Sequence, residues 1–238
     1  MNYIKIDLGI TNTYLLHLKN GYMLIDTGYN SNYDSFVKGL KKNNIDISQI
    51  KYLFITHYHD DHAGFAAKLK EEFNIPLIVQ ETSVSLLSKG DSDGQEIEFP
   101  ITKRVGFIFG LFSKFHNNFK YPPVIINEKD IIIDGDDKNI LRSLGIPADI
   151  IFTPGHTCDS MSILCDDGVA FVGDACMNFL KFLGANYRPI YYTSLEKMYS
   201  SIERLISLGA KTIVPAHGKE YDVSKLIDML RKKRSRIK

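Results

Sequence analysis

Thr56-His57-Tyr58-His59-Asp60-Asp61-His62-Ala63-Gly64 is the stretch that most constrains the fold and chemistry of this chain, because it holds three of the seven histidines. Residues 51–56 predict a buried strand that leads into it, and a helix is expected from residue 63 to 72. Imidazole nitrogen and carboxylate oxygen suit Zn²⁺ or a similar divalent ion. Residues 57 and 59 share one side of an extended chain, whereas 61 and 62 point elsewhere, so the stretch predicts two neighbouring metal positions.

Four residues cannot complete two tetrahedral metal sites, so further ligands are expected downstream. Three candidates each follow an apolar strand: His156 comes after residues 149–153, Asp174 after 169–172 and His217 after 212–215. In α/β folds, active sites form where strands give way to loops. The predicted metal ligands are therefore His57, His59, Asp61, His62, His156, Asp174 and His217.

The rest of the chain alternates short strands and helices, which predicts a mixed α/β layered fold. Strands are expected at residues 3–8, 13–18, 22–26, 51–56, 77–79, 130–134, 149–153, 161–165, 169–172 and 212–215. Helices are expected at residues 31–43, 63–72, 81–89, 194–208 and from 223 onward. We expect one domain over residues 1–238, with an aromatic-rich insert at about 91–123 that breaks the alternation.

The order of these motifs resembles that of the metallo-β-lactamase superfamily. The resemblance spans nearly the whole chain and begins at Leu24-Ile25-Asp26-Thr27-Gly28, before the cluster at 57–62 and the three later ligands. It implies an αβ/βα four-layer sandwich, in which two mixed β-sheets pack face to face between outer layers of helices. Asp26 matches a carboxylate that supports the loops beneath the site and does not itself bind metal.

The resemblance also implies how the ligands divide between two divalent ions, zinc first, with iron or manganese as alternatives. His57, His59 and His156 would bind one ion, Asp61, His62 and His217 the second, and Asp174 would bridge them. Two such ions lower the pKa of a shared water toward ~7. A metal-bound hydroxide oriented by Asp61 would then hydrolyse a small ester, lactone or thioester.

Other functions fit the same scaffold. A mononuclear iron oxidoreductase, similar to the persulfide dioxygenases, would use one ferrous ion at His57, His156 and Asp174. A phosphodiesterase is the second alternative. A non-catalytic binding module is a third, although a purely structural metal site would close the open position that Asp61 faces.

Composition restricts the partners. With 29 Lys and Arg against 28 Asp and Glu, the net charge is +1, which gives no field to gather nucleic acid or an anionic membrane. No apolar run is long enough for a membrane span, and no signal peptide is visible at the start. Three cysteines do not suggest a disulfide framework. We therefore expect a cytoplasmic protein that acts on a small molecule.

Substrate contacts are expected from two segments. The insert contributes Phe109 and Phe112, and it is expected to be an apolar lid, a homodimer surface or a helix simply packed on the sandwich. The segment after Asp174 offers hydroxyl and cationic groups that can hold an oxyanion, a carboxylate or a phosphate. These candidates are Lys181, Tyr187, Arg188, Tyr191 and Tyr192.

Overall fold

The histidine cluster follows a central strand of a six-stranded sheet. The computed structural model describes residues 1–112 and 119–235. The sheet has the order β1-β2-β3-β4-β5-β7. Its strands are β1 (Tyr3–Asp7), β2 (Asn12–Leu18), β3 (Gly21–Ile25), β4 (Ile50–Phe54), β5 (Leu77–Gln80) and β7 (Ile131–Ile133). Strands β1 to β3 are antiparallel, whereas β4, β5 and β7 run parallel to β3.

A second sheet faces the first and has the order β13-β12-β10-β9-β8. Its strands are β8 (Ala148–Phe152), β9 (Met161–Cys165), β10 (Val169–Phe171), β12 (Thr212–Val214) and β13 (Tyr221–Asp222). Strands β10 and β12 are parallel, and the other pairs are antiparallel. Both sheets are therefore mixed, as expected.

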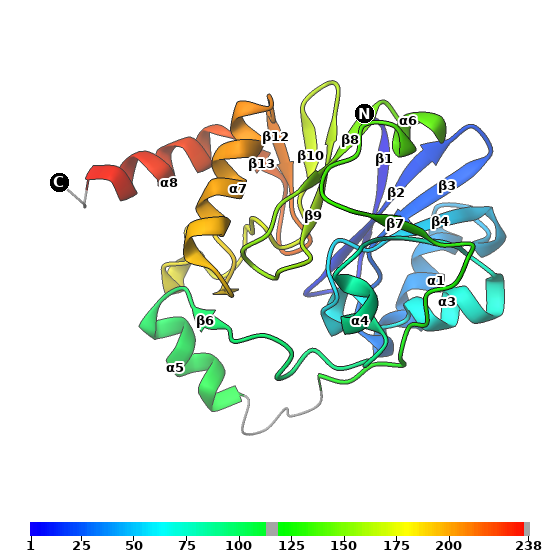
Figure 1. Cartoon of the computed structure of the whole chain (residues 1–238), viewed down its shortest axis with the longest axis horizontal. Helices are drawn as coiled ribbons and strands as arrows, with labels where there is room; N and C mark the ends of the chain where they lie inside the picture. The colour runs from blue at the N-terminus through cyan, green and yellow to red at the C-terminus, as the bar shows by residue number, and fades with distance from the viewer. Residues whose placement is uncertain (113–118, 236–238) are drawn as a thin grey trace.

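Eight α-helices lie in the described part of the chain. They are α1 (Tyr33–Lys42), α2 (Asp60–Ala63), α3 (Ala66–Phe73), α4 (Ser83–Leu87), α5 (Lys103–Phe112), α6 (Ile140–Ser143), α7 (Leu195–Ser207) and α8 (Ser224–Ser235). Short 3₁₀ turns span Asn30–Asn32, Ile47–Gln49 and Lys181–Leu183. In Figure 1, α1 and α3 lie outside the first sheet, and α7 and α8 lie outside the second. The order of layers is helix, sheet, sheet, helix.

Three apolar cores follow from the two-residue period of the strands. On β2, Leu15 joins the core between the first sheet and α1, which includes Phe36, whereas the adjacent Leu16 joins the core between the sheets. On β8, Ile150 faces the same central core and Ile151 faces the core under α7 and α8. Each sheet is thus buried on both faces, which fixes strand register and the positions at which the strands end.

The insert folds back on itself and reaches the second half of the chain. Its base is closed by a bridge between Asp91 and Lys120, and by a hydrogen bond from Ser92 N to Phe119 O (3.0 Å). Within it, β6 (Phe99–Pro100) pairs with β11 (Tyr191–Tyr192), and α5 follows β6. Figure 1 shows α5 and β6 away from the main sheets. Phe119 lies outside α5, and residues 113–118 are outside the described part.

The expected strands and helices are present, each within about three residues of its predicted bounds. The αβ/βα layering is confirmed. Strands β6, β11 and β13 and helix α6 were not predicted, because each is only two to four residues long and carries too few side chains for a period to show. A single domain stays a prediction.

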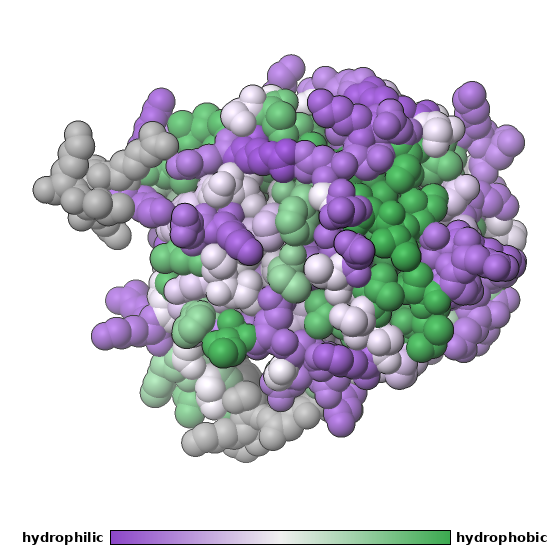
Figure 2. Space-filling model, viewed as in Figure 1, coloured by the Kyte–Doolittle hydropathy of each residue, from purple (hydrophilic) through white to green (hydrophobic). Residues whose placement is uncertain are grey.

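The surface in Figure 2 carries hydrophobic residues around β7, the edge strand of the first sheet. Exposed side chains there include Ile125 and Ile132. Among the described residues, no helix has the length and apolar character needed to cross a membrane.

The central core predicts a large and local effect of truncation. Phe171 is fully buried on β10 and meets Tyr3 and Tyr14 edge to face, at ring centroid distances of 5.0 and 5.4 Å. We expect Phe171→Ala to lower the free energy of unfolding by about 3–5 kcal/mol, through lost burial and a residual cavity. Urea denaturation of the wild type and the variant measures this difference in the free energy of unfolding. Ile132→Ala, on the exposed edge strand, should cost under about 0.5 kcal/mol, and equal losses for the two variants would refute the assignment of the core.

Candidate metal centre

Three histidines form the first group of candidate ligands. His57 follows β4, His59 precedes α2, and His156 lies in the loop between β8 and β9. One ring nitrogen from each lies within 4.8 Å of the others, and their ring centroids are 4.8 Å apart in all three pairs. His59 has an extended backbone, and the rings of His57 and His59 lie side by side, as expected. These three nitrogens could hold one metal ion.

The second group combines a carboxylate with two histidines. Asp61 and His62 lie in the first turn of α2, and His217 follows β12. His217 Nε2 lies 3.1 Å from Asp61 Oδ2, and His62 Nε2 lies 3.6 Å from Asp61 Oδ1. The turn of α2 brings Asp61 to His217, whereas the His62 ring lies 3.9 Å from that of His57, so His62 adjoins both groups.

Asp174 lies between the two groups. Its Oδ2 is 3.6 Å from His156 Nε2 and 3.4 Å from His217 Nε2, and its Oδ1 is 3.5 Å from His62 Nε2. It follows β10, whose parallel pairing with β12 brings 174 and 217 to the same sheet edge. The structure thus brings all seven predicted ligands together, with Asp174 in reach of both sites.

Each of the five clustered histidines contacts another group of the protein through the ring nitrogen that faces away from the centre. The outer nitrogens are His57 Nδ1, 3.1 Å from Thr56 Oγ1; His59 Nε2, 3.2 Å from Glu98 Oε1; His62 Nδ1, 2.8 Å from Asp26 Oδ2; His156 Nδ1, 2.9 Å from Tyr191 O; and His217 Nδ1, 3.0 Å from Ile10 O. An imidazole that donates from one nitrogen presents a lone pair on the other. All five inward nitrogens are therefore prepared to bind metal.

Unpaired buried atoms mark where the metals fit. Among the described residues, His57 Nε2, His62 Nε2 and Asp174 Oδ1 are buried and have no hydrogen-bond partner. Leaving such atoms unsatisfied costs free energy, and all three face the centre of the cluster. Bound divalent metal would satisfy them, and the donor set of five imidazoles and two carboxylates suits such an ion.

The carboxylates of the second group are held in the ionised form. Burial raises the pKa of Asp61 and Asp174, but His62 and His217 outweigh burial and hold both pKa values below the usual range. Burial lowers the pKa of His217, yet Asp174 and Asp61 raise it to about 10. The two carboxylates are therefore ionised beside protonated imidazoles. A divalent cation that binds here would replace the imidazole protons.

Asp26 supports the centre from below. Its carboxylate accepts hydrogen bonds from Thr56 N (2.7 Å) and Thr56 Oγ1 (2.8 Å) as well as from His62 Nδ1. Asp26 adopts φ 57°, a left-handed conformation that turns the chain directly after β3. The supporting position of Asp26 agrees with the expectation.

Two glycines permit the close approach of the loops. A Cβ on Gly64 would lie 2.4 Å from Gly28 O, and one on Gly173, at φ 47°, would lie 2.5 Å from Thr56 Oγ1. Any larger residue would separate α2 from the Asp26 turn, or β10 from β4. These glycines let both sheets contribute ligands to one site.

A cavity of about 500 Å³ opens onto the metal centre. Its polar side includes His59, Asp61, His156, Asp174 and His217. Its apolar side is lined by Ile10, Phe109, Phe119, Met177, Phe179 and Ile190. The volume suits a small organic molecule, and the apolar wall suits an acyl or aromatic group.

The predicted substrate residues divide between different surroundings. Phe109 and Tyr191 line the cavity, with ring centroids 5.8 Å apart. Tyr192 instead stacks near Phe99. Tyr187 and Arg188 line a separate cavity, because the left-handed backbone at 186 and 187 turns their side chains away from the metals.

Lys181 is not among the residues that line the cavity at the metals. Its ammonium group lies over the Tyr187 ring, 4.9 Å from the centroid. The side chain of Phe112 is outside the described part of the chain. The expectation that Lys181, Tyr187, Arg188 and Tyr192 face this cleft is therefore not what the structure shows, whereas substrate contact by Tyr191 and Phe109 stays a prediction.

Sequence reasoning missed Glu98 and Tyr29. Burial lowers the pKa of His59, but the hydrogen bond and charge of Glu98 raise it to about 9. Glu96-Ile97-Glu98-Phe99 alternates acidic and apolar residues, a pattern that places both glutamates on one side of an extended chain. This alternation could have identified Glu98 from the sequence.

Tyr29 lines the cavity beside Asp61, and no sequence motif marked it.

Fold and site together define an αβ/βα metalloprotein with paired histidine and carboxylate sites at one edge of its two sheets. The sequence model of the metallo-beta-lactamase superfamily matches residues 6–217. The chain therefore belongs to this superfamily, as the motif order predicted.

Known relatives agree with this assignment. "Probable metallo-hydrolase MJ0888" of Methanocaldococcus jannaschii is 31% identical over 159 residues, which cover 67% of this chain and 64% of that protein. "Probable metallo-hydrolase YflN" of Bacillus subtilis is 25% identical over 225 residues, with 88% and 81% covered. The chain spans only 57% to 64% of the length of three curated relatives.

Solved structures support the fold alone. The archaeal metallo-beta-lactamase superfamily protein ST1585 from Sulfolobus tokodaii superposes with a TM-score of 0.66 at 19% identity, over 97% of this chain and 85% of that one. Rm3 metallo-beta-lactamase gives a TM-score of 0.62 at 21% identity, over 91% and 75%.

Glu98 predicts a metal-affinity effect that is confined to one site. Glu98→Ala removes the acceptor that fixes the His59 ring, so we expect metal at the first site to bind about 10–100-fold more weakly. Competition with a chromogenic chelator measures this. Glu71→Ala, at an exposed position of α3, is the control. An unchanged affinity in Glu98→Ala would show that the contact has no role.

Proposed function

We propose that this protein is a dinuclear metal-dependent hydrolase of a small ester, lactone or thioester. The observation that carries the proposal is the bridging position of Asp174, within 3.6 Å of His156 in one group and within 3.5 Å of His62 and His217 in the other. A site for a single ion needs only one of these groups. The donor set supports zinc first, with iron or manganese as alternatives.

When bound, two divalent ions would supply an activated water and an electrophilic centre for the substrate oxygen. The chain itself orients the reacting groups. Asp61 is held ionised, and its Oδ2 accepts from Thr11 Oγ1 at 3.4 Å. It lines the cavity, so its carboxylate can accept a hydrogen bond from the attacking water and fix its direction.

Tyr29 is the proposed donor to the substrate. The charge of Asp61 and burial both raise the pKa of Tyr29, so its hydroxyl keeps its proton. A neutral hydroxyl in the cavity can donate a hydrogen bond to an oxygen on which negative charge develops. Tyr191, from β11, lines the opposite part of the same cavity.

The apolar wall supports a substrate with an acyl or aromatic part. Phe109 of α5 and Phe179, whose ring centroid is 5.8 Å from that of His217, lie on either side of the polar ligands. Closing this wall around a substrate would exclude bulk water from the centre. We therefore favour the lid interpretation of the insert over a homodimer surface.

Elemental analysis separates this proposal from its rivals. Two equivalents of zinc, manganese or iron per chain support it, whereas one iron with oxygen consumption on a persulfide supports the oxidoreductase. Turnover of phosphodiesters alone supports the phosphodiesterase.

We propose the cytoplasm as the setting of this protein. Its three free cysteines are consistent with a reducing compartment.

Loss of the bridging ligand gives the direct test. We expect Asp174→Ala to lose bound metal and to lower kcat/KM by at least about 100-fold on a panel of chromogenic esters, lactones and thioesters. Chelation of the wild type should abolish activity, and added metal should restore it. Asp34→Ala, at an exposed position in α1, is the control and should change neither quantity. Full turnover by metal-free Asp174→Ala protein would exclude the proposed mechanism.

The lid interpretation predicts a chain-length effect. Phe109→Ala should raise KM for long-chain acyl esters or thioesters about tenfold, because a buried aromatic contact of about 1–3 kcal/mol is lost. Acetyl substrates should be little affected. Phe107 lies on the same helix but is 71% exposed and does not line the cavity, so Phe107→Ala is the matched control. Equal effects on short and long acyl groups would rule out a lid at this position.

A further inference from the structure

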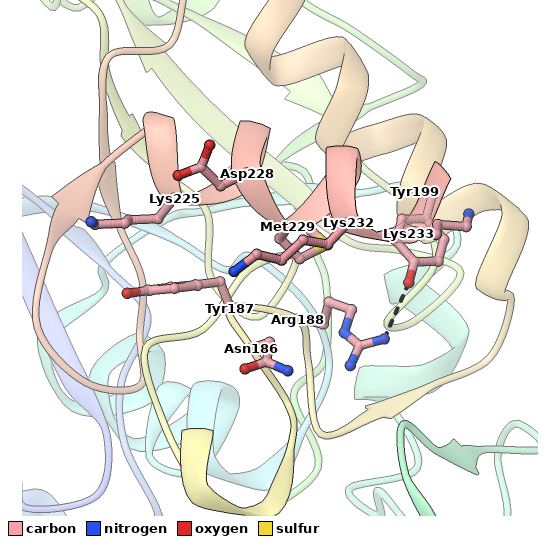
Figure 3. Close-up of a pocket in the computed structure, with 9 residues that line it drawn as sticks. All are labelled: Asn186, Tyr187, Arg188, Tyr199, Lys225, Asp228, Met229, Lys232 and Lys233. Atoms are coloured by element: carbon pink, nitrogen blue, oxygen red, sulfur yellow. Dashed lines mark hydrogen bonds between the residues drawn. The ribbon is translucent and has the colours of Figure 1, made fainter. Parts of the chain in front are cut away.

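A second cavity, of about 510 Å³, lies between α8 and the loop that precedes β11. It shares no lining residue with the cavity at the metals. Its walls are Asn186, Tyr187 and Arg188 from the loop, Tyr199 from α7, and Lys225, Asp228, Met229, Lys232 and Lys233 from α8. Figure 3 shows side chains of α8 on one side of this space and Tyr187, Asn186 and Arg188 on the other.

The lining is strongly cationic. Arg188, Lys225, Lys232 and Lys233 contribute four positive groups, against one carboxylate. That carboxylate, Asp228, lies 3.7 Å from Arg231 one turn away, which offsets its charge. The lining thus carries a local excess of positive charge, although the whole chain has a net charge of only +1. Such a concentration attracts anions.

Arg188 is fixed in place rather than left to move in solvent. Its Nε donates to Ala185 O (2.8 Å), its Nη2 to Gly184 O (2.7 Å), and its Nη1 to Tyr199 Oη (3.2 Å). These bonds use three of the five N–H groups of a guanidinium and leave two for a ligand. A guanidinium held in this way binds phosphate oxygens with little loss of entropy.

The spacing of the lysines indicates the size of the anion. Lys225 and Lys232 are seven residues apart on α8, which places them on one face and about 10 Å apart along the axis. Linked phosphates fit this spread better than a single phosphate. The ammonium group of Lys233 lies over the Tyr199 ring, 3.2 Å from the ring centroid. Lys233 therefore contacts the cavity wall and is not assigned to the phosphates.

The remaining walls suit an organic group. Tyr187 and Met229 present aromatic and thioether surface beside the cations, whereas Tyr199 is 7% exposed and lies under Lys233. We propose that this cavity binds a nucleoside diphosphate or a small molecule that carries the same diphosphate group. Arg188, Lys225 and Lys232 hold the phosphates, Tyr187 and Met229 contact the organic part, and Tyr199 fixes Arg188.

Isothermal titration calorimetry with ADP and with inorganic pyrophosphate tests this site on the full chain. We expect both to bind, ADP more tightly, and inorganic phosphate to bind at least about tenfold more weakly than pyrophosphate. Affinity should fall as salt rises. Asp174→Ala should bind ADP as the wild type does, because the two cavities share no residue; binding that disappears in this variant would place ADP at the metals and overturn the proposal.

Variants of the cavity complete the test. Lys232→Gln and Arg188→Met should each weaken ADP binding by about five- to tenfold or more. Lys197→Gln, at an exposed position of α7 outside the cavity, should have no effect. Circular dichroism checks the fold of Arg188→Met, and Lys232→Gln tests the site without touching the buried network. Unchanged binding in Lys232→Gln, or binding of single-stranded RNA without binding of ADP or pyrophosphate, would overturn the proposal.

Discussion

The structure depends on one buried carboxylate, that of Asp26. The side chain is 1% exposed, and burying a charge without partners would cost several kcal/mol. Asp26 offsets this cost by accepting from Thr56 N, Thr56 Oγ1 and His62 Nδ1. These bonds join the end of β3 to the end of β4 and to α2, so the turn after the strand, the first helical turn and one imidazole are fixed by the same group.

The other ligands extend this constraint across both sheets. Thr56 Oγ1 also binds His57 Nδ1, and Thr56 O accepts from Met161 N of the second sheet (2.9 Å). Asn12 in turn binds Ala216 O through its backbone and its side chain, which holds the segment that carries His217. The metal centre therefore lies on a continuous hydrogen-bonded seam between the sheets, and the central core below it keeps the two sheet edges in register.

The sequence was sufficient to predict that the seven candidate ligands lie together, because each follows a strand whose apolar pattern is strong, Asp61 and His62 in the short helix that comes after it. It was insufficient where position depends on how a loop folds back. Glu98 reaches His59 only because the insert returns to pair with β11, and that contact joins residues 39 positions apart. Tyr187 and Arg188 were expected at the metals, but two successive left-handed residues direct them to the other side of the loop, and nothing in the residue types there requires such a turn.

The small β6–β11 sheet contributes both to the candidate metal centre and to the cavity wall. Tyr191 O accepts from the outer nitrogen of His156, and Glu98, directly before β6, binds the outer nitrogen of His59. Two of the three histidines of the first site are thus oriented by one two-stranded element. The same element places the Tyr191 ring against Phe109 on the cavity wall. A ligand that displaces this wall would also shift the groups that hold the two imidazoles. For the proposed acyl substrate, a group that fits the wall would leave the ligands in their binding geometry, whereas one that distorts the wall would weaken metal binding.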